Sequence, residues 1–574
     1  LTPPPADAHR LGRVGAEMWI RDRSSRAPPP AGGSGGGPRA PGGAASSTHQ
    51  LDAQPGLHTV RRWTRDRPRA TPDRGAVDDR GVTLRYRDLH ERASALAAAF
   101  REAGYGVGDR VATVTGNSAD QVVLFFACAQ AGLVLAPLSW RLSPGELAAQ
   151  VEQADPALAL VEQEFSGLAD SAFDRLDPLR RLDGERPGRP PRRAELGRSG
   201  VEAHVPPPSR RGPAPERRPV RDDDPLLLVF TSGTQGTPKG ALLTHANCFW
   251  TNLSLSRTVE LTSHDVVLSV LPQFHAGGWN IQPLLAWWTG ATVVLERTFE
   301  PERVLQLVAE RRVTTMMGVP TNYLLLAAHP GFADAARSSL RRAVVGGAPG
   351  PAAGVRTWHR RGVALSQGYG LTEAGPNVLC LPDDQARERS GSAGTPYPHV
   401  EVAVADPVPG RPRAGPAAGE LRGGGPGGFA GYFRDEAATA AVLRDGWLRT
   451  GDLVERDADG CYRVVDRLKD VYNVGGENVT PSEVQALLRR HPAVADVAVV
   501  GVPDDRWGEV GAAFVVPRAG HPTDAEELEA FCRRELAHFK VPRRFDLVPS
   551  LPRTSLHKVS RRSLAERVTV PEDS

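Results

Sequence analysis

The chain has 574 residues, more than one ordinary hydrophobic core serves, so we expect a large body and a smaller second domain. Hydrophobic residues make up 40% of the chain, which is enough to bury an interior and excludes disorder throughout. The formal net charge is only +3, so no overall electrostatic field favours nucleic acid or a membrane surface as a partner.

Two stretches rich in Pro and Arg stand out along the chain. Residues 1–55 show no periodic apolar pattern, so we expect a disordered leader or an artefact there. Residues 178–221 have a similar bias, which predicts an irregular, solvated linker or a corrupted stretch rather than a basic partner-binding patch. A folded domain is therefore expected to begin at residue 56 and to carry one irregular segment.

Elsewhere, short apolar runs alternate with amphipathic helical patterns. We expect helices over 88–103 and 301–311, and strands over the apolar runs at 110–115, 226–230, 266–270, 291–295, 313–317 and 343–345. This alternation predicts an α/β fold, with a large multilobed N-terminal domain over 56–467 built of mainly parallel sheets covered by helices.

The pattern changes near Asp466. Helices are expected over 481–490 and 524–536, with strands over 497–500 and 513–516. This arrangement predicts a small, mobile α+β domain over 468–574, with the boundary at residues 467–469.

The cysteines and the apolar stretches bear on the cellular compartment in which the protein is expected. The five cysteines are far apart, without a CxxC pair, and predict neither a disulfide framework nor a zinc site: Cys128, Cys248, Cys380, Cys461 and Cys532. Such usage is typical of a reducing, cytoplasmic location. The apolar stretch at 122–138 contains Gln130 and Pro137, so it predicts a buried helix followed by a strand and no transmembrane segment.

Lysine is scarce in this chain. Only four of the 70 basic residues are lysines: Lys239, Lys469, Lys540 and Lys558. We expect lysine to be kept where a compact, flexible point charge is needed instead of the planar guanidinium fork. Coding bias is the alternative, and the positions of the lysines relative to the motifs below decide between the two.

A loop rich in hydroxyl groups and glycine follows the apolar run LLLVF. Its sequence, TSGTQGTPKG, brings hydroxyls, glycine amides and one ammonium group together at the end of a strand, as binding of a phosphate chain requires. Pro238 precedes Lys239, so this is not a Walker A loop. The phosphate-binding residues expected here are Thr231, Ser232, Gly233, Thr234, Gln235, Gly236, Thr237 and Lys239.

This loop resembles the phosphate loop of the adenylate-forming superfamily, which includes acyl-CoA synthetases, luciferases and peptide-synthetase adenylation domains. Further family motifs follow in order: YGLTE at 369–373, TGD at 450–452, DRLKD at 466–470, and PRT at 552–554 with Lys558. The resemblance spans about residues 57–565. It implies activation of a carboxylic acid by ATP to an acyl adenylate with release of pyrophosphate, followed by thioester formation with coenzyme A.

The resemblance also implies roles for the residues that bind the phosphates. Lys239 and the loop hydroxyls hold the β- and γ-phosphates, Glu373 carries Mg²⁺, and Thr372 contacts the α-phosphate. Lys558 reaches in from the small domain and bridges the attacking carboxylate and the α-phosphate during adenylation. His557 stands where the family usually has Gly, which restricts the backbone beside this lysine.

For the nucleoside, the resemblance implies that Tyr369 stacks on adenine, while Asp452 accepts hydrogen bonds from the ribose hydroxyls with Arg467 nearby. The other residues expected around the nucleotide are Gly347, Ala348, Pro349, Gln367, Gly368 and Gly370. Lys469 matches the hinge about which the small domain rotates between the two half-reactions, and Gly475 and Gly476 line the pantetheine tunnel.

The acyl site is expected at the motif QFHAGGWN, residues 273–280, with His275, Gly277 and Trp279 around the acid. Amino-acid-activating relatives have Asp at the position of His275, so an acid without an α-amino group is favoured. A fatty acid is the first expectation and an aryl or cinnamate-like acid the second. A stand-alone adenylation enzyme that loads a carrier protein, and a non-catalytic nucleotide binder, are the alternatives.

Two further features complete the expectations. Three of the four lysines fall at motif positions, which argues against coding bias, whereas Lys540 is expected to be structural. The run GELRGGGPGG at 419–428 is mostly glycine where the family has an apolar strand, so a weakened strand is expected there.

Replacing Lys558 by Ala should abolish acyl-adenylate formation, because the resemblance assigns to this lysine the charge that bridges the carboxylate and the α-phosphate. The measurement is acid-dependent pyrophosphate release from ATP. A Lys558→Ala protein that forms adenylate at the wild-type rate would contradict the assigned role.

Overall fold

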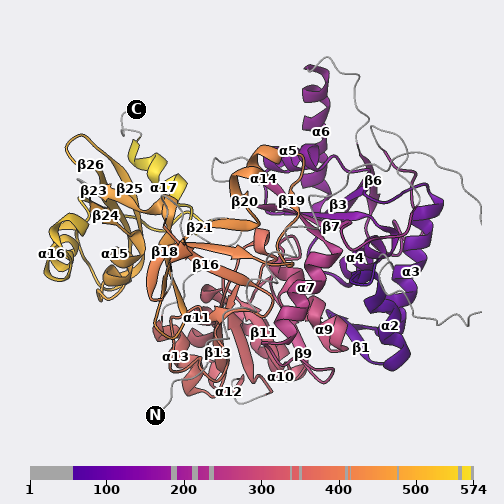
Figure 1. Cartoon of the computed structure of the whole chain (residues 1–574), viewed down its shortest axis with the longest axis horizontal. Coiled ribbons are helices and arrows are strands. Elements are labelled where there is room, and N and C mark those ends of the chain that lie inside the picture. Colours follow the sequence, from indigo (N-terminus) through magenta and orange to yellow (C-terminus); the bar gives the residue numbers. More distant parts are fainter. Residues whose placement is uncertain are drawn as a thin grey trace, which may run out of the picture. The chain divides into compact units, whose positions relative to one another are not determined.

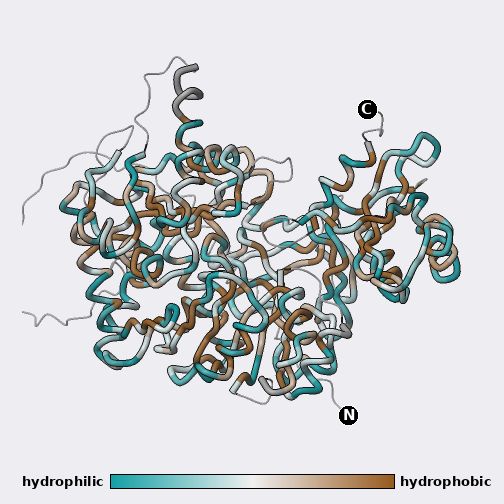
Figure 2. Tube along the Cα trace, turned by 180° about the vertical axis from the view of Figure 1, so that it is seen from behind, coloured by the Kyte–Doolittle hydropathy of each residue, from teal (hydrophilic) through white to brown (hydrophobic). Residues whose placement is uncertain are grey.

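A computed structural model describes residues 56–182, 191–209, 218–231, 238–335, 339–347, 352–406, 412–413, 415–474, 477–553 and 559–569. The expected leader, residues 1–55, lies outside the described residues. Among those that are described, the arrangement is α/β, as Figure 1 shows, and the predicted fold class is confirmed. In Figure 2 the hydrophobic stretches lie mainly toward the interior of the tube trace and the hydrophilic stretches mainly toward its periphery.

A nine-stranded sheet runs in the order β15-β14-β13-β12-β11-β9-β10-β1-β2. Its strands are β1 (Gly75–Asp79), β2 (Val82–Arg85), β9 (Val266–Ser269), β10 (Thr292–Leu295), β11 (Thr315–Gly318), β12 (Arg342–Val345), β13 (Ala364–Tyr369), β14 (Leu379–Cys380) and β15 (Thr395–Pro396). Pairing is parallel from β13 to β1, and only the end strands are antiparallel. The polar tips of its parallel strands therefore meet at one edge.

Helices connect the parallel strands of this sheet and cover one of its faces. They are α10 (Pro301–Glu310), α11 (Pro320–Ala328), α12 (Phe332–Ala335) and α13 (Ala352–Arg360). Leu326, Phe332 and Trp358 from these helices pack on Leu268 and Met316 from the strands. The other face packs on α9 (Pro283–Thr289) and, through Trp279, on α8 (Gly277–Asn280).

A seven-stranded sheet runs in the order β19-β8-β7-β4-β3-β5-β6. Its strands are β3 (Arg110–Val114), β4 (Val134–Leu138), β5 (Leu158–Val161), β6 (Arg192–Glu195), β7 (Pro225–Thr231), β8 (Lys239–Thr244) and β19 (Gly431–Tyr432). Successive residues of β3 face opposite layers: Val111 packs in the cluster with α3 and α4, and Ala112 in the cluster with α5 and α6. Those helices are α3 (Tyr86–Glu102), α4 (Ala119–Ala131), α5 (Pro144–Ala154) and α6 (Ser166–Leu182).

Two predicted elements of this part of the chain, the stretch at 122–138 and the helix expected at 88–103, can be compared with the structure. The stretch at 122–138 forms the buried helix α4 and then β4, as expected. Helix α3 begins at Tyr86 rather than at residue 88, because the Asp88 side chain accepts a hydrogen bond from the Arg85 amide and so belongs to the first turn.

The prediction of a solvated linker is wrong for residues 191–209. Strand β6 pairs in parallel with β5, and Val201 and Val205 are buried. Glu202 forms an ion pair with Arg92 of α3. The composition of this stretch predicted a linker, but a few of its apolar and acidic residues contact residues that lie far away in the sequence and so become ordered.

A six-stranded antiparallel sheet completes the large domain. Its strands are β16 (Glu401–Ala405), β17 (Pro412–Arg413), β18 (Ala417–Gly424), β20 (Leu443–Arg444), β21 (Trp447–Arg456) and β22 (Tyr462–Arg467). The glycine-rich strand β18 is formed, with β16 on one side and β21 on the other. A Cβ on Gly419 would lie 2.4 Å from the Ala405 carbonyl oxygen, so one of these glycines permits close strand approach.

The small domain is built on a five-stranded sheet of β23 (Tyr472–Val474), β24 (Glu477–Val479), β25 (Val494–Asp504), β26 (Gly508–Pro517) and β27 (Arg544–Leu547). Helices α15 (Pro481–Leu488) and α16 (Ala525–Glu535) cover one face, and α17 (Arg561–Thr569) the other. Lys540 bonds both oxygens of Glu483 at 2.8 and 2.9 Å, the structural role expected for it. The six-stranded sheet ends at Arg467, so a boundary at 467–469 leaves each sheet in one domain.

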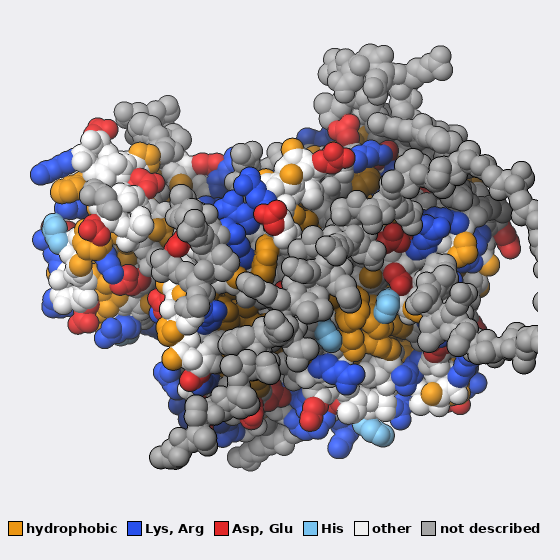
Figure 3. Space-filling view, viewed as in Figure 1, with side chains coloured by type: hydrophobic (Ala, Val, Ile, Leu, Met, Phe, Trp, Pro, Cys, Tyr) orange, Lys and Arg blue, Asp and Glu red, His pale blue; other side chains and the backbone are white. Residues whose placement is uncertain are grey.

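The cysteines and the surface agree with the composition. All five cysteines are buried and free. Lys and Arg side chains are interspersed with Asp and Glu over the face drawn in Figure 3. No helix among the described residues combines the length and the apolar character that crossing a membrane requires.

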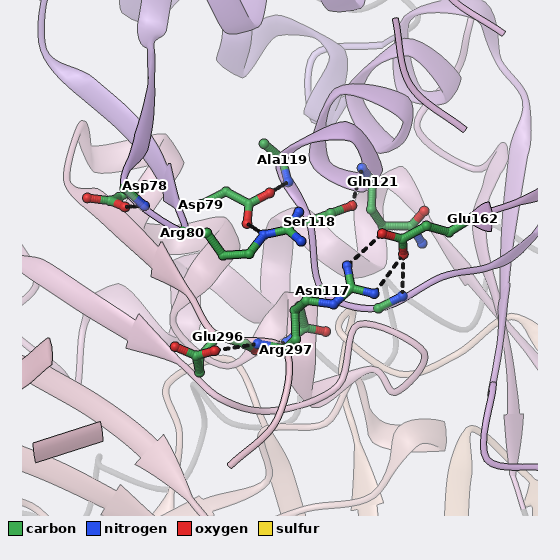
Figure 4. A network of polar contacts seen from close by, with 12 residues as sticks. Asp78, Asp79, Arg80, Asn117, Ser118, Ala119, Gln121, Glu162, Glu296 and Arg297 are labelled. Carbon is green, nitrogen blue, oxygen red and sulfur yellow. Dashed lines mark hydrogen bonds and ion pairs between the residues drawn. The ribbon is translucent and has the colours of Figure 1, made fainter. Parts of the chain in front are cut away.

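A polar network joins the tips of the nine-stranded and seven-stranded sheets (Figure 4). Asn117, which follows β3, donates to the carbonyl oxygens of Leu271 and Glu296 and accepts from the Gln273 amide. The Arg297 guanidinium donates to both oxygens of Glu162, at 2.7 and 3.0 Å. These bonds hold the edge where the strand tips of the two sheets meet.

Replacing Glu162 by Gln should lower the thermal midpoint by a few degrees at pH 7, through loss of about 2 kcal/mol from a mostly buried charge-assisted pair. Burial opposes ionisation of Glu162, but hydrogen bonds from Arg297, Thr115 and Gly116 outweigh it and hold its pKa below the ordinary 4.5. A lowered pKa stabilises the fold above pH 4.5 and loses that effect as the pH falls through the lowered value.

Thermal denaturation of wild type and Glu162→Gln from pH 7 to pH 3 measures this difference. The two midpoints should converge below pH 4.5. The matched control is Glu164→Gln, whose half-exposed side chain contacts the same arginine and should cost far less. A difference as large at pH 3 as at pH 7 would contradict the assignment.

Candidate functional site

The phosphate loop lies at the tip of the β7–β8 hairpin. Thr231 is the last residue of β7 and Lys239 the first of β8, and the two are direct partners across the hairpin. Both ends of the expected loop are therefore held by strand pairing. The residues between them lie outside the described part of the chain: Ser232, Gly233, Thr234, Gln235, Gly236 and Thr237.

Glu373 lies directly beside this hairpin, although it comes from the nine-stranded sheet. It belongs to η3 (Thr372–Ala374), which follows β13, and its neighbour Thr372 is half-buried. The Thr231 hydroxyl donates to Glu373 Oε1 at 3.3 Å. The Tyr432 hydroxyl donates to the same oxygen at 2.8 Å, and the Phe429 amide donates to the Glu373 carbonyl at 2.9 Å. Two segments distant in sequence, one at Thr231 and one at 429–432, thus converge on Glu373.

Tyr432 is a residue that the sequence did not single out. Burial and the adjacent Glu373 carboxylate raise the pKa of its hydroxyl, so it remains a proton donor at all physiological pH values. The Lys239 ammonium lies 5.1 Å from the centre of the Tyr432 ring, within cation–π range. The sequence signal was weak, since Tyr432 looks like any aromatic residue of a short strand.

The donor atoms around Glu373 suit a cation that is shared with phosphates. Both side-chain hydrogen bonds go to Oε1, and no described residue bonds Oε2. No group of three or more His, Cys, Asp or Glu among the described residues could enclose a metal ion. Mg²⁺ is bound through one or two carboxylates, with phosphates and waters completing its shell, so a single open carboxylate oxygen fits it.

A second polar cluster surrounds Asp452. Cross-strand pairing of β21 and β22 places Arg467 opposite Asp452, and Arg467 Nε lies 3.0 Å from Asp452 Oδ1. The Tyr369 hydroxyl donates to Oδ2 at 2.6 Å. Burial, followed by the charge of Asp452, raises the pKa of Tyr369 well above its usual range. The structure therefore brings together Tyr369, Asp452 and Arg467, which the sequence assigned to the nucleoside.

Glycines allow the backbone to come close beside these clusters. Gly347 follows β12 with φ +80°, and a Cβ on the preceding Gly346 would lie 2.9 Å from the Gly368 carbonyl oxygen. A Cβ on Gly370 would lie 1.4 Å from the Pro376 carbonyl oxygen, so only glycine fits there. Gln367 pairs with Val345 across the β12–β13 ladder. Ala348 and Pro349 lie outside the described residues.

The expected acyl residues separate into two groups. His275 is half-buried with its ring 4.6 Å from that of Phe274, and Gly277 lines a small apolar cavity together with Leu271, Ile281 and Met317. Ile281 and Met317 were not singled out from the sequence, because their burial depends on strands that meet only in the fold.

Trp279 does not lie at that cavity. Its side chain is fully buried, its ring stacks on Phe125 at 4.5 Å, and its Nε1 donates to the Gln273 carbonyl oxygen at 2.6 Å. The expectation that Trp279 packs against the acid therefore has no support in this arrangement. Residues 277 and 279 lie two positions apart on the single-turn helix α8, so the Trp279 side chain points away from the side of the helix where Gly277 borders the cavity.

The hinge region contains its own ion pairs. Lys469 is exposed in η4 (Leu468–Asp470), between the two domains. Asp466 accepts from the Ser482 amide at 2.9 Å and from Arg561 at 3.1 Å, and Arg561 also bonds Asp470 at 2.5 Å. The remaining expected residues, Gly475, Gly476, His557 and Lys558, lie outside the described residues.

Comparison with known proteins agrees with these two clusters. Residues 64–433 match the family model of the AMP-binding enzymes, and residues 483–558 match the C-terminal domain of those enzymes. The chain is 40% identical over 506 residues to a feruloyl-CoA synthase of an Amycolatopsis species, covering 88% of this chain and 98% of that protein. It is 35% identical over 500 residues to an indoleacetate–CoA ligase of Aromatoleum aromaticum, covering 86% and 95%.

Solved structures give the same result. The o-succinylbenzoate CoA synthetase of Bacillus subtilis, in complex with its acyl-adenylate intermediate, superimposes with a TM-score of 0.76 at 28% identity. The match covers 91% of this chain and 98% of that one. Both family models, the identity over nearly the whole length and the shared architecture lead to one conclusion: the chain belongs to the AMP-binding enzyme family of adenylate-forming ligases.

Proposed function

We propose that this enzyme activates an aryl or arylalkenoic acid with ATP and transfers the acyl group to coenzyme A. The observation that carries the proposal is the convergence of Thr231, Lys239 and Glu373 at the β7–β8 tip. A hydroxyl, an ammonium group and an open carboxylate oxygen match the needs of a phosphate chain and its divalent cation.

Each polar cluster has a part in the first half-reaction. Lys239 binds the outer phosphates of ATP, and Asp452, supported by Arg467, accepts hydrogen bonds from the ribose. Glu373 holds Mg²⁺, which neutralises phosphate charge when it is bound. The carboxylate of the acid attacks the α-phosphorus, the bond to the β-phosphate breaks and pyrophosphate leaves, while Lys558 stabilises the developing charge.

In the second half-reaction the thiolate of coenzyme A attacks the acyl carbon and AMP leaves. Rotation of the small domain about Lys469 replaces Lys558 at the site and lets Gly475 and Gly476 line the thiol channel. The Ser482 and Arg561 bonds to Asp466 link the two sides of that hinge, so they have to be remade on rotation. The five free, buried cysteines suit a reducing cytoplasm for this chemistry.

The relatives favour an aryl acid over the fatty acid that the sequence alone put first. Feruloyl-CoA synthase and indoleacetate–CoA ligase are both named for acids that carry a ring. The small cavity beside Gly277 is lined mainly by apolar side chains, with Ser269 and Gln282 among them, so the proposal places the apolar part of the acid on this side of the site. His275 stands where amino-acid-activating relatives have Asp, which agrees with an acid lacking an α-amino group.

Pyrophosphate release should be fastest with ferulate-like and other aryl acids, slower with fatty acids, and at background with amino acids. The panel is measured at equal acid concentration, with coenzyme A or a phosphopantetheinylated carrier protein as the acceptor. Activity confined to fatty acids or to amino acids would refute the substrate assignment. Acyl transfer to the carrier protein alone would favour the alternative of a loading enzyme.

Replacing Gly277 by Leu should raise KM for aryl acids by about tenfold or more, because the added side chain would take up space at the expected acyl position. The effect on a two-carbon acid should be smaller. The matched control is Trp279→Phe, which should lower the thermal midpoint through lost packing but leave the order of acids unchanged. An unchanged KM in the Gly277→Leu protein would place the acid elsewhere.

A further inference from the structure

Tyr432 occupies a position defined by strand pairing. Strand β19 pairs antiparallel with β8, and Tyr432 lies opposite Ala241. Side chains two residues apart on a strand share a face, so Lys239 and Ala241 point to the same side as Tyr432. The pairing register therefore places the tyrosine diagonally across from the lysine of the phosphate loop.

The side chain of Tyr432 contacts both the lysine of that loop and the Glu373 carboxylate beside it. Its hydroxyl donates to Glu373 Oε1 at 2.8 Å, and the Lys239 ammonium lies 5.1 Å from its ring centre. Thr231 supplies only a longer bond of 3.3 Å to the same carboxylate oxygen. Tyr432 is thus the stronger of the two donors that fix the carboxylate among the described residues.

Tyr432 is itself held on several sides. Its amide donates to the Thr439 hydroxyl at 2.9 Å, and its ring packs edge-on against Phe429 at 5.0 Å. Gly431 has φ +134°, and a Cβ there would lie 2.9 Å from the Thr439 methyl group. Glycine at 431 lets Thr439 come close to the strand, and the Thr439 hydroxyl then accepts the hydrogen bond from the Tyr432 amide. Gly431 and Tyr432 are therefore needed together.

We propose that Tyr432 is a positioning residue that holds Glu373 and Lys239 in their ATP-binding arrangement before ATP arrives. Its hydroxyl bonds Oε1, so Oε2 would be the oxygen available to a divalent cation, and its ring lies beside the ammonium group. This inference rests on the proposed function, since it concerns the phosphate site of the same reaction.

Replacing Tyr432 by Phe removes the hydroxyl and retains the ring. In the complex with α,β-methylene-ATP, the affinity for Mn²⁺, measured by electron paramagnetic resonance, should fall about tenfold, as is usual when a partner of a metal ligand is lost. Acid-dependent pyrophosphate release should fall likewise and recover at high Mg²⁺ concentration. A purely structural role would not be rescued by the cation.

Replacing Tyr432 by Leu removes the ring as well. This protein should show a further loss of affinity for the nucleotide analogue itself, beyond that of Tyr432→Phe, because the Lys239 ammonium loses its support. The loss should persist at saturating Mn²⁺. Equal nucleotide affinity in the two variants would overturn the part of the proposal that concerns Lys239.

The matched control is Tyr105→Phe, which removes one tyrosine hydrogen bond, to the Pro206 carbonyl oxygen, away from the two polar clusters. Its thermal midpoint should resemble that of Tyr432→Phe, while its Mn²⁺ affinity stays at the wild-type value. Wild-type Mn²⁺ affinity in Tyr432→Phe would overturn the proposal. An equal loss of Mn²⁺ affinity in the control would also overturn it, since the effect would then be general destabilisation.

These outcomes separate the inference from the proposed function. Binding of Mn²⁺ and the analogue needs no acid, so the Tyr432 result stands even if no acid on the panel is activated. Conversely, if Tyr432→Phe binds Mn²⁺ with wild-type affinity and activates aryl acids at the wild-type rate, the inference is wrong and the proposed function is unaffected. Failure of the wild-type protein to bind Mn²⁺ with the analogue would overturn both.

Discussion

The contact between Glu373 and the hydroxyls of Thr231 and Tyr432 is the constraint on which this site depends. Glu373 follows the nine-stranded sheet, whereas Thr231 and Tyr432 belong to the seven-stranded sheet. A carboxylate at this junction is tolerable because it is hydrogen-bonded. The same bonds tie two sheets together at the point where the phosphates of ATP are proposed to bind, so the fold and the site share one interaction.

That junction needs support from outside the site, which the network around Asn117 and Arg297 provides. Asn117 satisfies backbone groups after β9 and β10, and Arg297 pairs with Glu162 at the end of β5. A shift of one sheet against the other would break several of these bonds at once. Glycine backbones complete the support, since Gly370 and Gly375 lie against the Pro376 and Gly427 carbonyl oxygens, where a side chain has no room.

The region around the hinge is organised in a different way. Asp466 on the large-domain side bonds Ser482 and Arg561 from the small domain, and both of these contacts are polar. Polar contacts of this kind can be exchanged at low cost, unlike a buried apolar interface. The large domain is therefore held by its core and by buried networks, while the connection to the small domain suits a rotation between two half-reactions.

What the sequence alone determined is local in character. Apolar runs and helical periodicity were enough to predict α4 and β4, the strands β3, β7 and β9 to β12, and α15, α16, β25 and β26 of the small domain, because each depends on neighbours along the chain. The motifs around Thr231, Glu373, Asp452 and Arg467 could be recognised from the sequence because each is a short contiguous string of residues. Scarce lysines marked Lys239, and its place at the start of β8 agrees with that interpretation.

The tertiary structure alone decided which distant residues meet. Tyr432 acquires its importance from the β19–β8 pairing, and Ile281 and Met317 from the packing around Gly277. The same packing buries Trp279, which the sequence had assigned to the acid, and orders residues 191–209, which composition had marked as linker. Residue type and spacing indicate what a side chain can do, but its partners depend on sheet order and register, which form through contacts between segments far apart in the chain.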